Sequence, residues 1–132
     1  MAAIHEAMRS TRGAVAALAE IDEAAGELVY TGVGNISAAI FKAGQATHLV
    51  SVNGIVGHRM ERVREFRYPW SADSTLVMNS DGLKSRWSLY DYPGLAVRSA
   101  SLIAATLFHN LVRRTDDASV AVFRQGAPAY AA

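Results

Sequence analysis

The sequence lacks several residue types and patterns that mark particular classes of protein. None of its 132 residues is cysteine, which excludes disulfides, thiolate metal ligands and a cysteine nucleophile. Thirteen basic residues nearly balance twelve acidic ones, so the net charge of +1 gives no general attraction to nucleic acid or membranes. No apolar run approaches the length of a membrane-spanning helix, and the N-terminus lacks the pattern of a secretory signal. We therefore expect a cytoplasmic protein with no nucleic-acid or membrane partner.

What the chain does contain is enough apolar material for one packed domain, with 51% hydrophobic and 19% charged residues. Hydrophobic periodicity predicts helices over Ala2–Arg12 and Leu95–Arg114. The second helix carries an apolar stripe of Leu95, Leu102, Ala105, Phe108 and Leu111/Val112. Strands are predicted over Gly13–Ile21, Glu27–Val33, Ser37–Lys42, Thr47–Val52, Arg62–Trp70, Thr75–Met78 and Ser119–Phe123.

The first two predicted strands fit an antiparallel hairpin, because a short turn containing Asp22 and Gly26 separates them. The remaining elements predict an α+β domain whose sheet is largely antiparallel. The end of the chain, residues 125–132, is small and contains proline, and we expect it to be a flexible tail.

Two acidic segments follow or precede predicted core strands. Thr75–Met78 runs into Asp81-Gly82, which places a carboxylate at the end of a strand, where hard divalent cations find the oxygen ligands they prefer. Asp116-Asp117 stands just before the last strand. Antiparallel pairing of these strands would bring both acidic junctions to one edge. The alternatives stay open: Asp-Gly is a common turn dipeptide, and an acidic pair after a helix is also an ordinary solvated turn.

Other polar and aromatic groups carry weaker signals. The alternating Gly32 and Gly34 indicate a bulge or close strand packing rather than a phosphate loop, since no helix follows directly. The histidines show no metal-pair spacing. The arginine-rich stretch 58–67 is either a solvated face or a patch that contacts a phosphoprotein. The larger aromatics Trp70, Trp87, Tyr90 and Tyr92 are expected around the Asp81 segment, as packing under a loop or as contacts to a substrate protein.

The order of these motifs resembles one family. Gly13-Ala-Val-Ala, Leu28-Val-Tyr-Thr-Gly-Val-Gly-Asn-Ile-Ser, Phe66-Arg-Tyr-Pro-Trp70, Ser80-Asp-Gly-Leu83 and Asp116-Asp-Ala-Ser119 together resemble the SpoIIE-like branch of the PPM (protein phosphatase 2C-like) serine/threonine phosphatases. The resemblance implies an antiparallel β-sandwich flanked by helices and a two-metal site for Mn²⁺ or Mg²⁺, where a metal-bound water attacks phosphoserine or phosphothreonine. Asp81 and Asp116 match metal ligands of the family and Asp117 is the neighbouring candidate, while Gly82, Gly32 and Gly34 would be structural residues near the site.

The resemblance also implies a signalling context and an incomplete site. The partners would be a phosphorylated anti-sigma-factor antagonist and a histidine-kinase-like ATPase module. An upstream Asp-Gly-x-Gly-His-Gly-like turn, which carries further ligands in the family, is absent from this sequence. We therefore expect residues 1–124 to be the C-terminal part of an N-terminally incomplete PPM domain, weak or inactive alone and with an open side that a second copy could cover. The alternative is a non-catalytic regulatory or interaction module with this fold.

Overall fold

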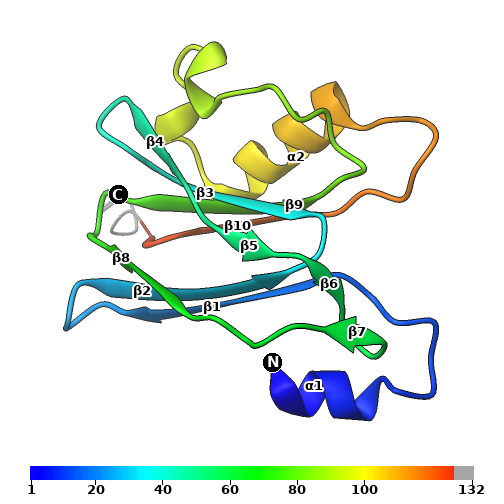
Figure 1. Ribbon diagram of the computed structural model, residues 1–132. Helices are drawn as coiled ribbons and strands as arrows, with labels where there is room; N and C mark the ends of the chain where they lie inside the picture. Colours follow the sequence, from blue (N-terminus) through cyan, green and yellow to red (C-terminus); the bar gives the residue numbers. More distant parts are fainter. Residues whose placement is uncertain (127–132) are drawn as a thin grey trace. The chain divides into compact units, whose positions relative to one another are not determined.

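The computed structural model describes residues 1–126, which form strands, two α-helices and two short 3₁₀ turns (Figure 1). The predicted tail falls mostly on residues 127–132, which lie outside the described residues. No described helix has the length and apolar character that a membrane span requires. The helical elements are α1 (Ala2–Ala7), η1 (Leu89–Asp91), η2 (Leu95–Val97) and α2 (Ala100–Leu111). The strands are β1 (Ala16–Asp22), β2 (Glu27–Val33), β3 (Ile36–Lys42), β4 (Gln45–His48), β5 (Ser51–Val52), β6 (Gly54–Ile55), β7 (Arg59–Met60), β8 (Phe66–Pro69), β9 (Thr75–Ser80) and β10 (Val120–Arg124).

The chain forms two compact units, and each is made of two stretches of sequence. Unit 1 comprises Met1–Ala38 and His48–Ser71. Unit 2 comprises Ala39–Thr47 and the chain from Ala72 onward. Strand β3 therefore begins in unit 1 and continues in unit 2.

Unit 1 is built around β2. The predicted hairpin of β1 and β2 is confirmed, with an antiparallel register that runs from Ala16 opposite Val33 to Asp22 opposite Glu27. Asp22 shapes the turn, because its Oδ1 accepts a hydrogen bond from the N–H of Ala25 at 2.9 Å. Strand β8 pairs antiparallel with the first half of β2, whereas β5 pairs parallel with its end. The sheet is therefore largely antiparallel, as expected, with one short parallel pairing.

The start of the chain is held to the rest of unit 1 by hydrogen bonds. Helix α1 ends at Ala7, several residues before the Arg12 that the sequence predicted. Its His5 accepts a hydrogen bond at Nδ1 from the N–H of Gly57 at 2.9 Å. Ala14 then forms an isolated antiparallel bridge with Val56, beside the β6–β7 hairpin that sequence reasoning missed (Figure 1).

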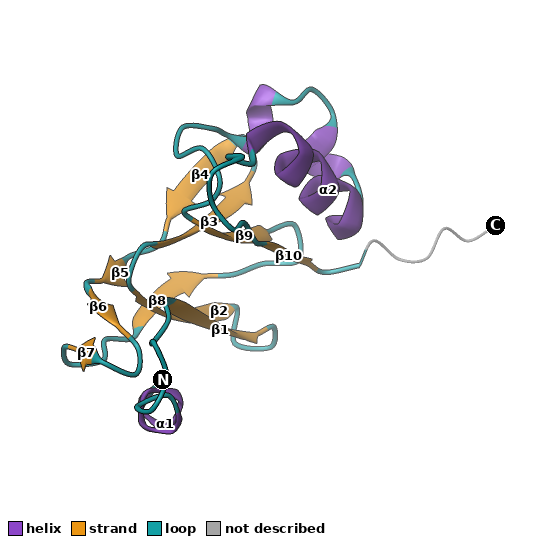
Figure 2. Cartoon of the chain, turned by 90° about the vertical axis from the view of Figure 1, so that its right-hand side faces the viewer, coloured by secondary structure: helices purple, strands orange, loops and turns teal. Residues whose placement is uncertain are grey.

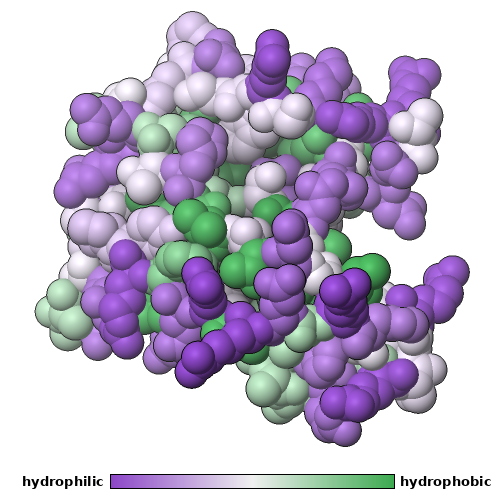
Figure 3. All heavy atoms as spheres, in the orientation of Figure 1, coloured by the Kyte–Doolittle hydropathy of each residue, from purple (hydrophilic) through white to green (hydrophobic). Residues whose placement is uncertain are grey.

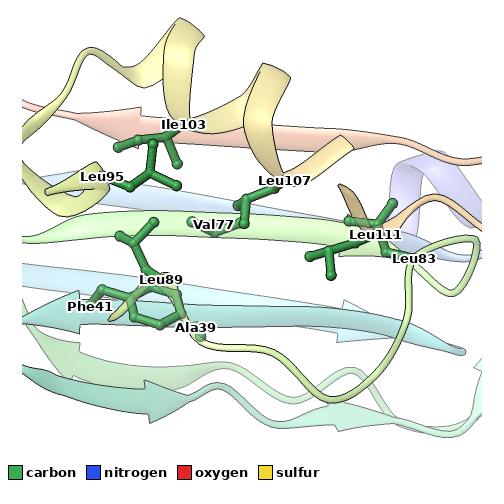
Figure 4. Packing of buried hydrophobic residues seen from close by; sticks show 9 residues of the cluster. All are labelled: Ala39, Phe41, Val77, Leu83, Leu89, Leu95, Ile103, Leu107 and Leu111. Atoms are coloured by element: carbon green, nitrogen blue, oxygen red, sulfur yellow. The ribbon is translucent and has the colours of Figure 1, made fainter. Parts of the chain in front are cut away.

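Unit 2 packs a helix on a sheet whose strand order is β10-β9-β3-β4. Figure 2 shows α2 and the 3₁₀ turns grouped together beside these strands. The buried cluster joins β3, β9, the two 3₁₀ turns and α2, and Figure 4 shows its side chains meeting between the helix and the strands. Its members are Ala39, Phe41, Val77, Leu83, Leu89, Leu95, Ile103, Leu107 and Leu111.

Helix α2 differs from the predicted helix in both its start and its buried face. Ser99 caps it, with its Oγ accepting a hydrogen bond from the N–H of Leu102, so the helix begins at Ala100 and not at Leu95. The buried residues are Ile103, Leu107 and Leu111, which repeat every four positions. The predicted stripe was wrong in part, because Leu102 is 49% exposed and Phe108 is 43% exposed.

Two predicted strands also differ from the structure. The run Thr47–Val52 contains the end of β4 and the whole of β5, which belong to different sheets. In the run Arg62–Trp70 only β8 pairs as a strand, and residues 61–65 form an irregular loop.

Apolar side chains also reach the surface of the molecule (Figure 3), and Val97, Val50 and Phe123 are among the exposed ones.

Candidate metal centre at the ends of β9 and β10

Pairing of β9 with β10 brings the two acidic segments of unit 2 together. Val120 lies opposite Asn79 in an antiparallel register. Beyond this pair, the N–H of Ser80 donates to the carbonyl oxygen of Ser119 at 3.1 Å. The N–H of Ser119 donates in turn to Oγ of Ser80 at 2.9 Å. The end of β9 and the start of β10 are therefore fixed against each other directly beside Asp81 and Asp117.

Gly82 allows the closest approach in this region. A Cβ atom at this position would collide with the carbonyl oxygen of Asp117 and would also crowd Cα of Ala118. The carbonyl oxygen of Gly82 accepts a hydrogen bond from the N–H of Arg113 at 2.8 Å. Only glycine therefore permits the Asp81 turn to lie against the chain that carries Asp117. The close packing at Gly82 is a feature of the fold, and its role in shaping a metal site stays a prediction.

The end of helix α2 supports the same turn. Leu83 is buried and forms an isolated bridge with Val112, while the N–H of Lys84 donates to the carbonyl oxygen of Leu111 at 2.9 Å. The hydrophobic cluster therefore anchors the turn on its inner side through Leu83 and Leu111. Sequence reasoning did not identify the linking role of the Ser80 hydroxyl.

The three candidate ligands are exposed carboxylates. Asp81, Asp116 and Asp117 all lie at the surface, which suits a site open to a divalent ion, water and a phosphate group. Their chemistry fits Mg²⁺ or Mn²⁺, but their arrangement does not complete a centre. Within residues 1–126, no group of three or more histidine, aspartate or glutamate side chains is placed to hold a metal ion. The assignment of these three aspartates as ligands stays a prediction.

Gly32 and Gly34 belong to unit 1, where both serve close backbone packing. A Cβ atom on Gly32 would collide with Oγ of Ser51 and the hydroxyl of Tyr30, because β2 and β5 pair in parallel at Gly32 and Ser51. Gly34 has a φ of +90°, and its N–H donates to the carbonyl oxygen of Val52 at 2.8 Å. This is the close strand packing that the sequence indicated; their predicted position near a metal site stays a prediction.

The aromatic residues do not form the single group that the sequence suggested around Asp81. Phe41 stacks on Trp87 with ring centroids 5.6 Å apart and meets Tyr90 edge-on at 5.9 Å. The Tyr90 hydroxyl accepts a hydrogen bond from the N–H of Gly44 at 3.0 Å. Trp70 belongs to the other unit. Trp87 and Tyr90 therefore pack the β3–β4 side of unit 2.

A buried polar chain distinguishes the interior of unit 1. The Tyr30 hydroxyl lies 3.0 Å from Oγ of Ser51, and that Oγ donates to the carbonyl oxygen of Ile36 at 3.0 Å. Since the Ser51 proton points to Ile36, Tyr30 is the donor of the first bond. Burial raises the pKa of Tyr30 above its ordinary value of 10.0, although the bond to Ser51 acts in the opposite direction.

Three of the clefts formed by residues 1–126 each lie within a single unit. One in unit 2 has a volume of about 330 Å³, and Tyr92, Pro93, Leu95 and Leu102 contribute much of its apolar lining. A second, of about 240 Å³ in unit 1, gathers Glu20, Asp22, Glu27, Glu65 and Arg67. A third, also in unit 1 and about 330 Å³, is lined by Ser51, Val52, Asn53, Glu61, Arg62 and Arg64.

Comparison with known proteins yields matches only among solved structures. No protein-family model matches the chain, and no curated protein matches it either. RsbX, in a crystal structure with magnesium, is 20% identical with a TM-score of 0.71, over 89% of this chain and 59% of that one. The phosphatase domain of the cell-fate determinant SpoIIE from Bacillus subtilis is 20% identical with a TM-score of 0.64, over 93% and 64%. The chain has the α+β fold of PPM phosphatase domains.

A further neighbour comes from a structure described as "The bacterial stressosome: a modular system that has been adapted to control secondary messenger signaling". It is 27% identical with a TM-score of 0.78, over 89% of this chain and 62% of that one. The chain thus spans about three fifths of the length of each of these neighbours. The predicted PPM fold class is confirmed, while metal binding and catalysis by this chain are not tested by these likenesses.

Proposed function

We propose that this chain is part of a PPM-type protein phosphatase that acts in partner-switching signalling. Its substrate would be phosphoserine or phosphothreonine on a regulatory protein of the anti-sigma-factor antagonist type, with a histidine-kinase-like ATPase module as a further partner. The fold supports this assignment, and so does the stressosome context of one neighbour. The observation that carries it is the Asp81-Gly82 turn, which lies against Asp117 at the paired ends of β9 and β10.

In this proposal the chain supplies one acidic portion of a Mn²⁺ or Mg²⁺ centre. Asp81 and Asp116 would be ligands, Asp117 would be the neighbouring candidate, and the remaining ligands would come from outside residues 1–126. The neighbour RsbX is described in complex with magnesium. A bound divalent ion would activate water and neutralise phosphate charge. The chain's own part is to hold its carboxylates on a turn that the hydrophobic cluster fixes from within.

Titration of Mn²⁺ into the full chain by calorimetry tests the metal role. We expect weak binding that Asp81→Asn reduces further. Asp73→Asn is the matched control, because Asp73 is an exposed aspartate of the same unit whose carboxylate pairs with Lys42 at 3.5 Å. Equal Mn²⁺ binding by the wild-type chain and Asp81→Asn would contradict the assignment of Asp81.

Hydrolysis of p-nitrophenyl phosphate and of a phosphoserine protein tests whether the chain acts alone. We expect weak or no turnover, because residues 1–126 present no group of three ligands. Strong Mn²⁺-dependent turnover that disappears in Asp81→Asn would show instead that this chain builds the whole centre.

The same lack of a ligand group among residues 1–126 favours a second candidate function. In this case the chain is a non-catalytic regulatory or interaction module that retains the phosphatase fold. The two candidates differ in one measurement: binding of a regulatory phosphoprotein that is indifferent to Mn²⁺ and to Asp81→Asn supports the non-catalytic module.

A further inference from the structure

The loop between β7 and β8 separates its charges between two clefts of unit 1. Arg62 and Arg64 line the cleft that also contains Ser51, Val52 and Asn53. Glu65 instead joins Glu20, Asp22 and Glu27 in the acidic cleft, where Arg67 pairs with Glu27. This short segment therefore contributes two cations to one cleft and a carboxylate to another cleft that is lined mostly by carboxylates.

The side chains of Arg62 and Arg64 have no partner among the described residues, unlike those of Arg9 and Arg124. Arg9 pairs with Glu6, and Arg124 donates to backbone carbonyl oxygens near α2. In contrast, neither Arg62 nor Arg64 forms an ion pair or hydrogen bond with any other residue of the described chain. Both side chains are exposed and keep their full set of N–H donors for a ligand.

The other residues that line this cleft add one hydrogen-bond donor, Asn53, and a backbone segment at Ser51 that strand pairing holds in place. The side-chain amide of Asn53 is exposed and has no hydrogen-bond partner within residues 1–126. Ser51 is already engaged, since its Oγ bonds Tyr30 and Ile36, and the β2–β5 pairing fixes its backbone. The cleft therefore combines a wall whose backbone is held by strand pairing with two exposed cationic side chains. Its volume of about 330 Å³ lies within the range of roughly 300–1,000 Å³ that is typical of ligand pockets.

We infer that this cleft binds a phosphoryl group, with Arg62, Arg64 and Asn53 as its donors. The guanidinium group is planar and presents paired N–H donors that match phosphate oxygens, so two of them can hold a dianion from two sides. Glu61 lines the same cleft and opposes the anion, which keeps binding moderate and reversible. The phosphoryl group has two possible sources, a phosphorylated protein segment or free inorganic phosphate.

This inference rests on the proposed function and deepens it, because the cleft of unit 1 would then recognise the phosphorylated state of the regulatory protein, whereas the candidate metal centre belongs to unit 2. Binding is measured in EDTA, without turnover, so its outcome is independent of the metal role of Asp81. If Asp81→Asn loses only Mn²⁺ binding and the double arginine variant loses only phosphopeptide binding, both proposals hold. If the cleft variants bind normally, only the inference about the cleft fails.

The test titrates a short phosphoserine peptide, its unphosphorylated form and inorganic phosphate into the full chain. We expect the phosphopeptide to bind and the unphosphorylated peptide not to bind. The double variant Arg62→Gln/Arg64→Gln should weaken binding at least about tenfold, because it removes two charge-assisted contacts. Arg59→Gln is the matched control, since Arg59 is an exposed arginine of β7 that does not line the cleft, and it should change affinity by less than about twofold.

Variants of the two glutamates provide a second test, in which one substitution is expected to raise the affinity for the phosphopeptide and not to lower it. Glu61→Gln should tighten phosphopeptide binding, whereas Glu65→Gln, in the acidic cleft, should leave it unchanged. Binding of inorganic phosphate but not of the phosphopeptide would assign the cleft to the free anion. Equal affinity for the phosphorylated and unphosphorylated peptides, or no effect of the double arginine variant, would overturn the inference.

Discussion

Different kinds of contact stabilise the interiors of the two units. Unit 2 contains a continuous cluster of aliphatic and aromatic side chains between α2 and the strands. In unit 1 the central strand β2 buries the polar bonds of Tyr30, and a Cβ atom on Gly32 would collide with Oγ of Ser51. We therefore expect loss of side-chain volume to weaken the core of unit 2, and added volume or loss of a hydroxyl to weaken the packing around β2 in unit 1.

Leu107→Ala tests the hydrophobic side of this comparison and should have the largest effect. Leu107 is fully buried in the cluster of unit 2, and its truncation leaves a cavity. We expect the free energy of unfolding in urea to fall by about 2–5 kcal/mol. Leu102→Ala on the same helix removes the same atoms from a residue that is 49% exposed, and should cost about 1 kcal/mol or less. Similar losses of unfolding free energy in the two variants would contradict the burial of Leu107 in the cluster.

Gly32→Ala tests the close packing of unit 1. The added methyl group meets Oγ of Ser51 and the hydroxyl of Tyr30, so the two strands must separate or the buried bonds must break. We expect a loss of about 1–3 kcal/mol in unfolding free energy. Gly126→Ala is the control, because a Cβ atom there meets no neighbouring atom. A Gly32→Ala variant as stable as wild type would show that β2 and β5 do not approach as closely as described.

Tyr30→Phe tests the buried polar chain and should have the smallest effect at neutral pH, about 0.5–1.5 kcal/mol. Its pH dependence has a definite sign. Above the ordinary value of 10.0, the unfolded chain releases the Tyr30 proton while the folded chain, with its raised pKa, retains it. Wild-type stability should therefore fall as pH rises above this value, and the fall should be shallower in Tyr30→Phe.

Urea unfolding between pH 8 and pH 11 measures that slope, with Tyr90→Phe as the matched control. Tyr90 lies at the surface of unit 2, where its hydroxyl meets the N–H of Gly44. An alkaline slope that is identical in wild type and Tyr30→Phe would contradict the burial of this phenol.

The predictable parts of the fold are those that local sequence determines. The β1–β2 hairpin follows from the Asp22 and Gly26 turn between two apolar runs, and β9 follows from a compact apolar run that ends at a turn. The boundary between β4 and β5 was not predictable in this way. Leu49 and Val50 continue the apolar pattern between them, and only the pairing of β5 with β2 separates the two strands.

The prediction of the buried face of α2 was wrong in part for a related reason. Leu102, Ile103, Leu107 and Phe108 are all apolar, so the helix offers two overlapping stripes, and only the partners in the sheet select the stripe of Ile103 and Leu107. The acidic segments could be found from the sequence because acids at strand ends are visible there. The clefts of unit 1 could not, because the sequence favoured a strand at Arg62 and Arg64, whereas the chain forms a loop there.

Because each unit consists of two stretches of sequence, a single cut cannot divide the chain into two complete units. The chain passes from one unit to the other three times, after Ala38, Thr47 and Ser71. A cut after Ser71 leaves unit 1 complete but deprives unit 2 of the segment that carries Ala39 and Phe41 of its core. Unit 2 is therefore not a separable fragment, and its assembly must wait for contacts between remote parts of the chain, which slows folding. Expressed from Ala72 onward, the chain that carries Asp81 and Asp116 should fail to form a cooperative core, even though every predicted metal ligand is present in it.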